Sequence, residues 1–239
     1  MNTISFNKGN TKIVAHRGVS GLEMENSIAA FVAAGNRSYT GIETDVHVTK
    51  DQQIIVIHDD TTLRVTGVDK VVEESTLAEL QAIPLYDMQE GTSRTDLHMP
   101  LLNEYIDICK KYEKTAVLEL KNAMTPDDIR KIIGIIEDCG YLEEVIFISF
   151  SWENCVTLRQ FLPSQRVQFL TKECDEELME KLVANKLDLD IHYQALTKEM
   201  IDALHAKGII VNCWTVNDKE SGEQLASWGI DYITTNILE

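Results

Sequence analysis

The chain has 239 residues, a length that suits one α/β barrel, which typically needs about 250 residues. Hydrophobic residues make up 44% and charged residues 26%, near the globular averages of roughly 45–50% and 25%, so long disordered segments are excluded. The formal net charge of -17 makes nucleic acid and anionic lipid surfaces unsuitable partners. An anionic small-molecule substrate would need local cations or a metal ion in order to bind.

The sequence shows no pattern typical of export or membrane insertion. Residues 1–11 contain no apolar segment of the signal-peptide kind, and no apolar run approaches the roughly 20 residues that span a bilayer. The five cysteines are scattered and lack C-x-x-C spacing, which is typical of reduced thiols. We therefore expect a cytoplasmic protein without stable membrane insertion.

Strand-like and helix-like patterns alternate from the start of the chain, as in parallel βα units. The first expected elements are a strand at 12–17, a helix at 26–35 capped by Asn26 or Ser27, and strands at 42–49 and 53–58. Only residues 50–52 separate the last two strands. A linker this short cannot form a parallel crossover, so the sequence predicts an antiparallel hairpin there.

The pattern weakens after His58 and then resumes. Thr76 and Glu79 have the spacing of a capping box for a short helix, and Thr125 followed by Pro126 marks another helix start. The later expected elements are helices at 103–112, from 125 and at 197–207, strands at 115–121, 145–149, 166–170, 187–192, 209–214 and 231–235, and a helix capped by Asn217 or Asp218.

Nine strand-like segments result, whereas a (β/α)8 barrel closes with eight. We therefore predict a single domain over 1–239 with an irregular TIM (β/α)8 barrel fold and an inserted segment after the third strand, at about 60–99. One strand-like segment must lie partly outside the closed barrel, and the sequence does not identify which.

Carboxylates recur at period two within apolar strands. Glu43 and Asp45 share one strand face, and Glu119 lies within another strand. Grouped buried carboxylates repel one another unless a cation neutralises them, so we favour a metal site over strand-end carboxylates exposed to solvent. Oxygen ligands select Mg²⁺ or Ca²⁺. His47 shares the face of Asp45 but lies further along the hairpin, where we expect a partly exposed residue.

Histidines end the first and third expected strands. In the predicted hairpin, Glu43 near the start of one strand and His58 at the end of the next lie at the same rim. A lone strand-end histidine is often structural, but His16 and His58 converging on carboxylates indicate a general acid/base pair. Arg17 could grip phosphate oxygens, and Lys121 could add a point charge.

The ordered combination of His16-Arg17-Gly18, Glu43-Thr44-Asp45, His58-Asp59, Glu119-Leu120-Lys121 and Trp214-Thr215 resembles the glycerophosphodiester phosphodiesterase family over nearly the whole chain. The resemblance implies metal ligands at Glu43, Asp45 and Glu119 and catalytic histidines at His16 and His58. It also implies substrate contacts from Arg17 and Lys121, with the Trp214 ring against the glycerol portion. Glu25 and Asn26 match a Glu-Asn pair expected to support the site through hydrogen bonds.

The implied reaction is metal-dependent hydrolysis of a glycerophosphodiester to glycerol 3-phosphate and an alcohol. Two alternatives stay open: a lysophospholipase D-type phosphodiesterase acting on acylated substrates, and a non-catalytic phosphodiester-binding barrel. The expected partner is a small-molecule substrate, and a homo-oligomer is allowed. The segment at about 60–99 has no long apolar run, which favours small, deacylated substrates.

Overall fold

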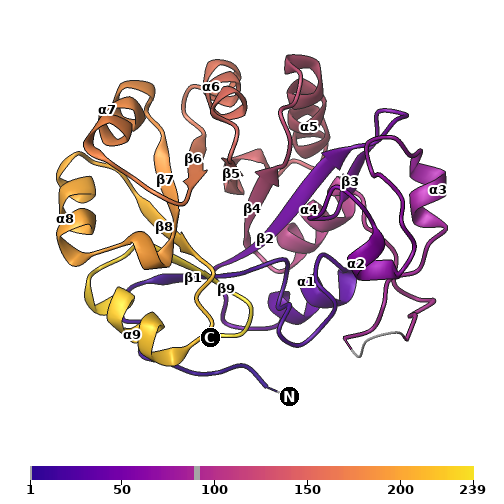
Figure 1. The fold of residues 1–239 in the computed structure, drawn as a ribbon, viewed down its shortest axis with the longest axis horizontal. Coiled ribbons are helices and arrows are strands. Elements are labelled where there is room, and N and C mark those ends of the chain that lie inside the picture. Colours follow the sequence, from indigo (N-terminus) through magenta and orange to yellow (C-terminus); the bar gives the residue numbers. More distant parts are fainter. Residues whose placement is uncertain (1, 89–91) are drawn as a thin grey trace.

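Eight parallel strands form a closed barrel, because β1 pairs with β9 on one side and with β2 on the other (Figure 1). The computed structural model describes residues 2–88 and 92–239. The barrel strands are β1 (Lys12–Ala15), β2 (Gly41–Val48), β4 (Thr115–Leu120), β5 (Val145–Ser149), β6 (Arg166–Thr171), β7 (Asp188–His192), β8 (Val211–Trp214) and β9 (Tyr232–Thr235). The predicted fold class is confirmed.

The strand outside the barrel is β3 (Ile54–Val56). It pairs only with β2 among the named strands, in antiparallel register with Val46 opposite Val56, so the predicted hairpin is confirmed. The pairing turns the chain back toward the barrel mouth, and His58 follows shortly after β3. The strand-like segment outside the closed barrel, which the sequence did not identify, is therefore β3.

Helices surround the barrel (Figure 1). They are α1 (Ile28–Gly35), α2 (Leu63–Thr66), α3 (Leu77–Gln81), α4 (Leu102–Lys111), α5 (Pro126–Asp138), α6 (Trp152–Phe161), α7 (Glu176–Asn185), α8 (Lys198–Ala206) and α9 (Lys219–Ser227), with short 3-10 turns η1 (Leu142–Glu144) and η2 (Tyr193–Ala195). The predicted caps at Thr76 and Thr125 form capping boxes, and Ser27 and Asp218 cap α1 and α9. None of the helices in the described ranges is long and apolar enough to cross a membrane.

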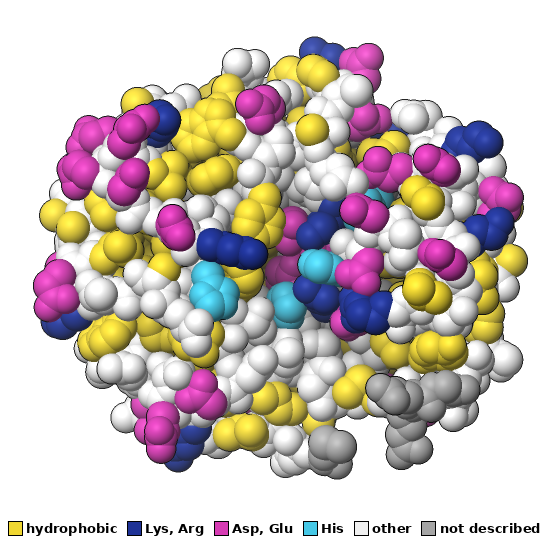
Figure 2. Space-filling model, viewed as in Figure 1, with side chains coloured by type: hydrophobic (Ala, Val, Ile, Leu, Met, Phe, Trp, Pro, Cys, Tyr) yellow, Lys and Arg dark blue, Asp and Glu magenta, His cyan; other side chains and the backbone are white. Residues whose placement is uncertain are grey.

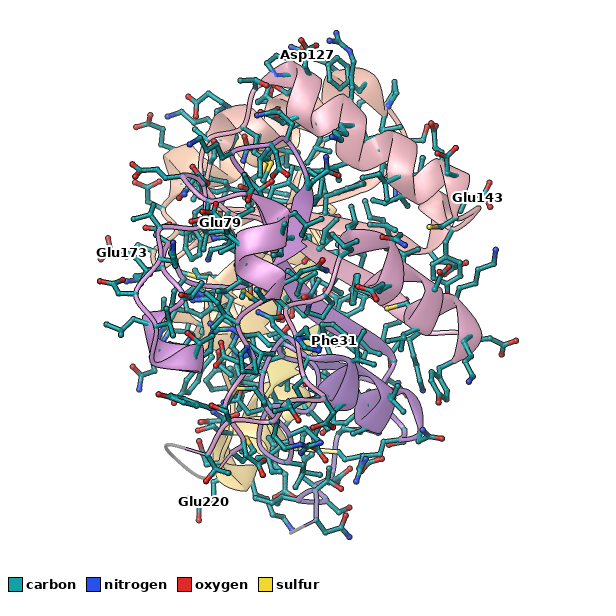
Figure 3. All side chains as sticks on the ribbon, turned by 90° about the vertical axis from the view of Figure 1, so that its right-hand side faces the viewer. Phe31, Glu79, Asp127, Glu143, Glu173 and Glu220 are labelled. Atoms are coloured by element: carbon teal, nitrogen blue, oxygen red, sulfur yellow. The ribbon has the colours of Figure 1, made fainter. Side chains whose placement is uncertain are left out.

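The strand side chains alternate between two apolar environments. On β1, Ile13 and Ala15 pack in the core between barrel and helices, whereas Val14 belongs to a smaller apolar group with Val117 and Tyr232. Figure 3 shows Phe31 of α1 in the interior, while the labelled acidic residues Asp127, Glu143, Glu173 and Glu220 lie at the outside of the molecule. Much of the negative charge is therefore solvated surface.

The segment between β3 and α4 carries α2 and α3 and has an apolar core of its own. That core contains Ile55, Ile57, Val65, Val72, Leu80, Leu85, Leu97 and Met99. The segment corresponds to the predicted insertion, of which residues 89–91 lie outside the described ranges. Because it packs beside β2 and β3, it brings its first residues to the edge of the barrel mouth.

Candidate active site

A small cavity of about 100 Å³ opens where the barrel strands end at their carboxyl side. Its lining residues are His16, Arg17, Glu43, His58, Glu119, Ile148, Phe150, Leu170, Asp190, Trp214, Thr215 and Thr234. Figure 2 shows acidic side chains deep in the central hollow, with histidine and basic side chains around them. Six of the eight predicted site residues line this cavity, and the other two, Asp45 and Lys121, form ion pairs with the lining residues Arg17 and Glu119.

The three predicted metal ligands form one buried group. Glu43, Asp45 and Glu119 are 2%, 1% and 7% exposed, and each offers a carboxylate oxygen such that all three oxygens lie within 4.8 Å of one another. Their strands are adjacent, with Asp45 opposite Glu119 in the β2–β4 register. Ile42, Thr44 and Val46 point the other way, so period-two alternation aims the acidic side chains inward.

The protonation of this group reflects burial and mutual repulsion. Burial raises the pKa of Glu43, and the charge of Asp45 raises it further. The same two causes raise the pKa of Glu119 to about 8. Burial acts to raise the pKa of Asp45 as well, but Arg17 and Lys121 hold it below its usual value. The group therefore combines an ionised Asp45 with a Glu119 that retains a proton at neutral pH, and the same causes favour the protonated form of Glu43.

A divalent cation fits this group. The Asp45 Oδ1 atom is buried and accepts no hydrogen bond from any described residue, with Lys121 Nζ only as near as 3.7 Å, although a buried carboxylate oxygen without a hydrogen bond is costly. A hard cation would partner that oxygen and relieve the repulsion that raises the other two pKa values. The donor set, three carboxylates without sulfur or imidazole, matches Mg²⁺ or Ca²⁺ better than Zn²⁺.

Two positively charged side chains, Arg17 and Lys121, flank the carboxylates. The Arg17 Nη1 atom lies 2.9 Å from Glu25 Oε1, and its Nε lies 3.5 Å from Asp45 Oδ2. Lys121 Nζ lies 2.8 Å from Glu119 Oε1 and 3.7 Å from Asp45 Oδ1. Both side chains are about 15% exposed, so each can present part of its charge to an anion in the cavity.

His16 is held by the far end of the chain. Its Nδ1 atom lies 2.7 Å from Asn236 Oδ1, and an amide oxygen there fixes the hydrogen on Nδ1 and leaves Nε2 as the acceptor nitrogen. Burial, aided by the charge of Arg17, lowers the pKa of His16 to about 4. The imidazole is therefore neutral near pH 7 and able to accept a proton.

His58 has a different partner. Its Nδ1 atom lies 2.7 Å from Asp59 Oδ1, so a carboxylate supports this ring. Burial lowers the pKa of His58, while the charge of Asp45 opposes that effect. Arg64 of α2 donates to Asp59 through Nε at 2.6 Å and to Glu25 through Nη1 and Nη2 at 2.8 Å. A continuous chain of polar contacts thus connects His58 through Arg64 and Glu25 to Arg17.

Trp214 ends β8 and forms one wall of the cavity. Its ring makes edge-to-face contacts with Phe150, at a centroid distance of 5.6 Å, and with His192, at 5.2 Å. Asp190, on the neighbouring strand β7, is 1% exposed and lines the same cavity. Burial, together with the charge of Glu119, raises the pKa of Asp190.

The expected supporting hydrogen bonds are present. Asn26 donates from Nδ2 to Asp45 Oδ2 at 2.8 Å, and Glu25 accepts from Arg17. The expectation for His47 is wrong: its side chain is fully buried, with Nδ1 3.1 Å from Glu73 Oε1 and Nε2 3.3 Å from the His58 carbonyl oxygen. The inserted segment covers this position, which the hairpin pattern alone did not indicate.

Sequence reasoning missed four residues of the site. They are Asp59, Arg64, Asp190 and Asn236. Asp59 directly follows His58, a signal that could have been used. Arg64 contacts the distant Glu25 as well as Asp59, and Asn236 contacts His16 across most of the chain. Asp190 lies in an expected strand without a local motif that would mark it. Only the assembled barrel places them together.

Comparisons with known proteins agree with the geometry. The family model described as the glycerophosphoryl diester phosphodiesterase family matches residues 16–239. The Bacillus subtilis (strain 168) protein YhdW is 32% identical over 237 residues, covering 94% of this chain and 93% of that protein. The Homo sapiens lysophospholipase D GDPD1 is 39% identical over 266 residues, covering 95% and 83%.

A solved structure shares the fold. An Oleispira antarctica phosphodiesterase, solved in complex with the product sn-glycerol-3-phosphate, matches with a TM-score of 0.88 at 24% identity, covering 98% of this chain and 96% of that one. The family match spans the range that contains all of the predicted site residues, and the family and the named relatives favour an enzyme over the non-catalytic alternative. The chain is therefore an enzyme that belongs to the glycerophosphoryl diester phosphodiesterase family.

Proposed function

We propose that this enzyme hydrolyses glycerophosphodiesters to glycerol 3-phosphate and an alcohol. One arrangement carries the proposal: two histidines, each anchored through Nδ1, stand at a cavity with a buried carboxylate trio and two cations. This set contains a proton acceptor, a proton donor and positive charge for an anionic phosphate. The product bound in the Oleispira antarctica relative supports this substrate class.

Glu43, Asp45 and Glu119 would hold one divalent cation, Mg²⁺ or Ca²⁺. When bound, such an ion neutralises phosphate charge and lowers the pKa of a hydroxyl group beside it. Arg17 and Lys121 bind the non-bridging phosphate oxygens, orient the diester and stabilise the charge that develops on those oxygens. Because the cavity is small and its polar groups are buried, these interactions are stronger than they would be in water.

The first step moves two protons. His16 Nε2 accepts the proton of the substrate's 2-hydroxyl as that oxygen attacks phosphorus. The bond from phosphorus to the departing oxygen breaks, and His58 Nε2 donates a proton to the released alcohol. The product of this step is a cyclic phosphate. His16 is then protonated and His58 is neutral, the reverse of their starting states.

The second step reverses the roles. His58 Nε2 accepts a proton from a water molecule that attacks phosphorus of the cyclic phosphate. The ring bond to the 2-oxygen breaks, and His16 returns its proton to that oxygen. Glycerol 3-phosphate leaves, and both histidines regain their starting protonation states.

The partners of the two rings support this division of roles. The Asp59 carboxylate stabilises a positively charged His58, as a proton donor requires. Burial and the nearby charge of Arg17 disfavour the protonated form of His16, as a proton acceptor requires, while the Asn236 amide holds Nδ1 and leaves Nε2 facing the substrate. An anionic phosphate in the cavity would further favour the protonated form of His58.

A second candidate, lysophospholipase D-type hydrolysis of acylated substrates, is favoured by one observation: the 39% identical human relative carries that name. The size of the cavity, about 100 Å³, suits the deacylated glycerol unit better.

We also propose a cytoplasmic location for this enzyme, and its five free cysteines agree with that location.

The test is release of glycerol 3-phosphate from glycerophosphocholine by EDTA-treated protein, before and after Mg²⁺, Ca²⁺ or Mn²⁺ is restored. We expect release only with an ion present. Lysophosphatidylcholine is assayed in parallel, and its hydrolysis at an equal or higher kcat/KM would favour the second candidate. Absence of turnover on both substrates with every ion would contradict the proposed function.

A further inference from the structure

On the wall of the cavity formed by β7 and β8, two buried polar atoms have no hydrogen-bond partner among the described residues. They are the Oδ1 atom of Asp190 and the Nε1 atom of Trp214. One accepts hydrogen bonds and the other donates them, and both residues line the same cavity. An unpartnered buried polar atom costs free energy and usually indicates that something else completes its bonding.

The Asp190 carboxylate is held from behind. Its Oδ2 atom accepts from Asn212 Nδ2 at 3.1 Å. Asn212 is itself fixed, because its Nδ2 donates to Gln168 Oε1 at 3.3 Å and its Oδ1 accepts from Thr234 Oγ1 at 3.3 Å. This network spans β6, β7, β8 and β9. It occupies one carboxylate oxygen and leaves the other to the cavity.

The Trp214 ring is held by edge-to-face contacts with the rings of Phe150 and His192. In the β7–β8 register His192 lies opposite Trp214, and Asp190 precedes His192 by two residues on the same strand. The donor and the acceptor therefore belong to adjacent strands and share one wall of the cavity. Their side chains are positioned before any ligand arrives.

The chemistry of this pair selects its ligand. An alcohol hydroxyl can donate to Asp190 Oδ1 and accept from Trp214 Nε1 at once. An ether or ester oxygen has no hydrogen to donate, an ammonium group cannot accept from the indole, and a second phosphate would meet a carboxyl group. If Asp190 is protonated, the second lone pair of the hydroxyl oxygen accepts its hydrogen, so a hydroxyl fits either form of Asp190. An ether or ester oxygen is refused by the ionised form, and the bulk of an acyl group is refused by the small cavity in both forms.

We propose that Asp190 and Trp214 form a subsite for the terminal hydroxyl of the substrate's glycerol unit. The inference rests on the proposed function, in which the 2-hydroxyl meets His16 and the phosphate meets Arg17 and Lys121. The terminal hydroxyl is then the one polar group of the glycerol unit without an assigned partner. Asp190 would thus select deacylated substrates over those esterified at that hydroxyl.

The test compares glycerophosphocholine with the analogue that lacks only this hydroxyl, the phosphocholine diester of propane-1,2-diol esterified at C1. A site that hydrogen-bonds a substrate hydroxyl strongly rejects the analogue without it, so we expect the analogue's kcat/KM to be at least about a hundredfold lower. In Asp190→Leu and in Trp214→Phe this ratio should fall below about tenfold, mainly through loss of activity on glycerophosphocholine.

Asp188→Leu is the matched control, because it makes the same change on the same strand at a residue outside the cavity lining. Its substrate ratio should equal that of the unmodified enzyme. Equal use of both substrates by the unmodified enzyme would overturn the subsite. So would variants that lose activity on both substrates in parallel, since a structural defect lowers both.

A binding measurement distinguishes failure of this inference from failure of the proposed reaction. Calorimetry with glycerol 3-phosphate and with propane-1,2-diol 1-phosphate should show at least about tenfold tighter binding of the first, lost in both variants. That result without turnover of any glycerophosphodiester would support the subsite and contradict the reaction. Turnover of glycerophosphocholine without discrimination in binding or kinetics would do the reverse.

Discussion

His16 and Asn236 are joined by a contact of 2.7 Å between Nδ1 and Oδ1, although 220 positions separate them in the chain. The Asn236 backbone N–H is bonded in turn to Asn217 Oδ1 at 2.8 Å, so the last loop of the chain is anchored where it meets the first strand. Burial and the charge of Arg17 keep His16 uncharged, and the amide, which carries no charge, opposes them only weakly. His58, whose Nδ1 faces Asp59, has the opposite support.

Exchanging the amide for a carboxylate should move the pH profile. In Asn236→Asp the new charge favours protonated His16, so its pKa should rise from about 4 by about 1–2 units. A protonated His16 cannot accept a proton, so the acid limb of the kcat/KM profile should move to higher pH. Asn236→Ser, which adds no charge, is the control. An unshifted acid limb in Asn236→Asp would rule out His16 as the proton acceptor.

The leaving group should reveal which histidine is the acid. His16→Ala and His58→Ala should each lower kcat for glycerophosphocholine by roughly 10²–10⁴-fold. With a p-nitrophenyl ester of glycerol 3-phosphate, the departing phenolate needs no proton, so His58→Ala should recover most of its activity and His16→Ala should not. His205→Ala, on the outside of α8 and 36% exposed, is the control. Recovery in His16→Ala instead would exchange the two roles.

Arg64 should matter more for rate than for stability. It bonds Asp59 and Glu25 together, but its side chain is 47% exposed, and exposed ion pairs contribute only about 0–1 kcal/mol. Arg64→Met should therefore lower kcat/KM by about 10–100-fold, because a small misplacement at the site is costly, and change unfolding free energy by less than about 1 kcal/mol.

Arg94→Met provides the matched control for Arg64. Arg94 belongs to the same inserted segment and pairs with Asp96 in a similar exposed position, away from the cavity lining. Steady-state kinetics and urea unfolding of both variants make the comparison. Equal activity of the two variants would show that the bridge to Asp59 and Glu25 does not position the site.

Metal binding should release protons. Burial and the charge of Asp45 raise the pKa of Glu119 to about 8 and also raise that of Glu43, so Glu119 holds a proton near pH 7 in the metal-free protein and protonation of Glu43 is favoured. A bound ion requires ionised ligands, so about one to two protons should leave per Mg²⁺ or Ca²⁺ bound at pH 7. Affinity should rise between pH 6 and pH 8 for the same reason.

Calorimetry of the EDTA-treated protein in buffers of different ionisation enthalpy measures this release. Glu119→Gln should bind the ion more weakly and release about one proton fewer. Binding without proton release at pH 7 would contradict the raised pKa values. Ion binding that survives Glu119→Gln unchanged would remove Glu119 from the ligand set.

Local patterns in the sequence determined much of the architecture. The spacing of Thr76 and Glu79 marked a helix start that the structure confirms, and residues 50–52 were too few for anything but a hairpin. Period-two alternation placed Glu43 and Asp45 on one face with their apolar neighbours on the other. These features depend on interactions within a few residues of the chain, so the sequence carries them directly.

The tertiary structure alone decided how the site is completed. Which strand is left out depends on β1 pairing with β2 and β9, and β9 lies at the far end of the chain. The same closure brings Asn236 to His16, and the packing of the insertion buries His47 and places Arg64 at Asp59. Propensity and periodicity act over a few residues, whereas these contacts form only when distant strand ends meet at one barrel rim.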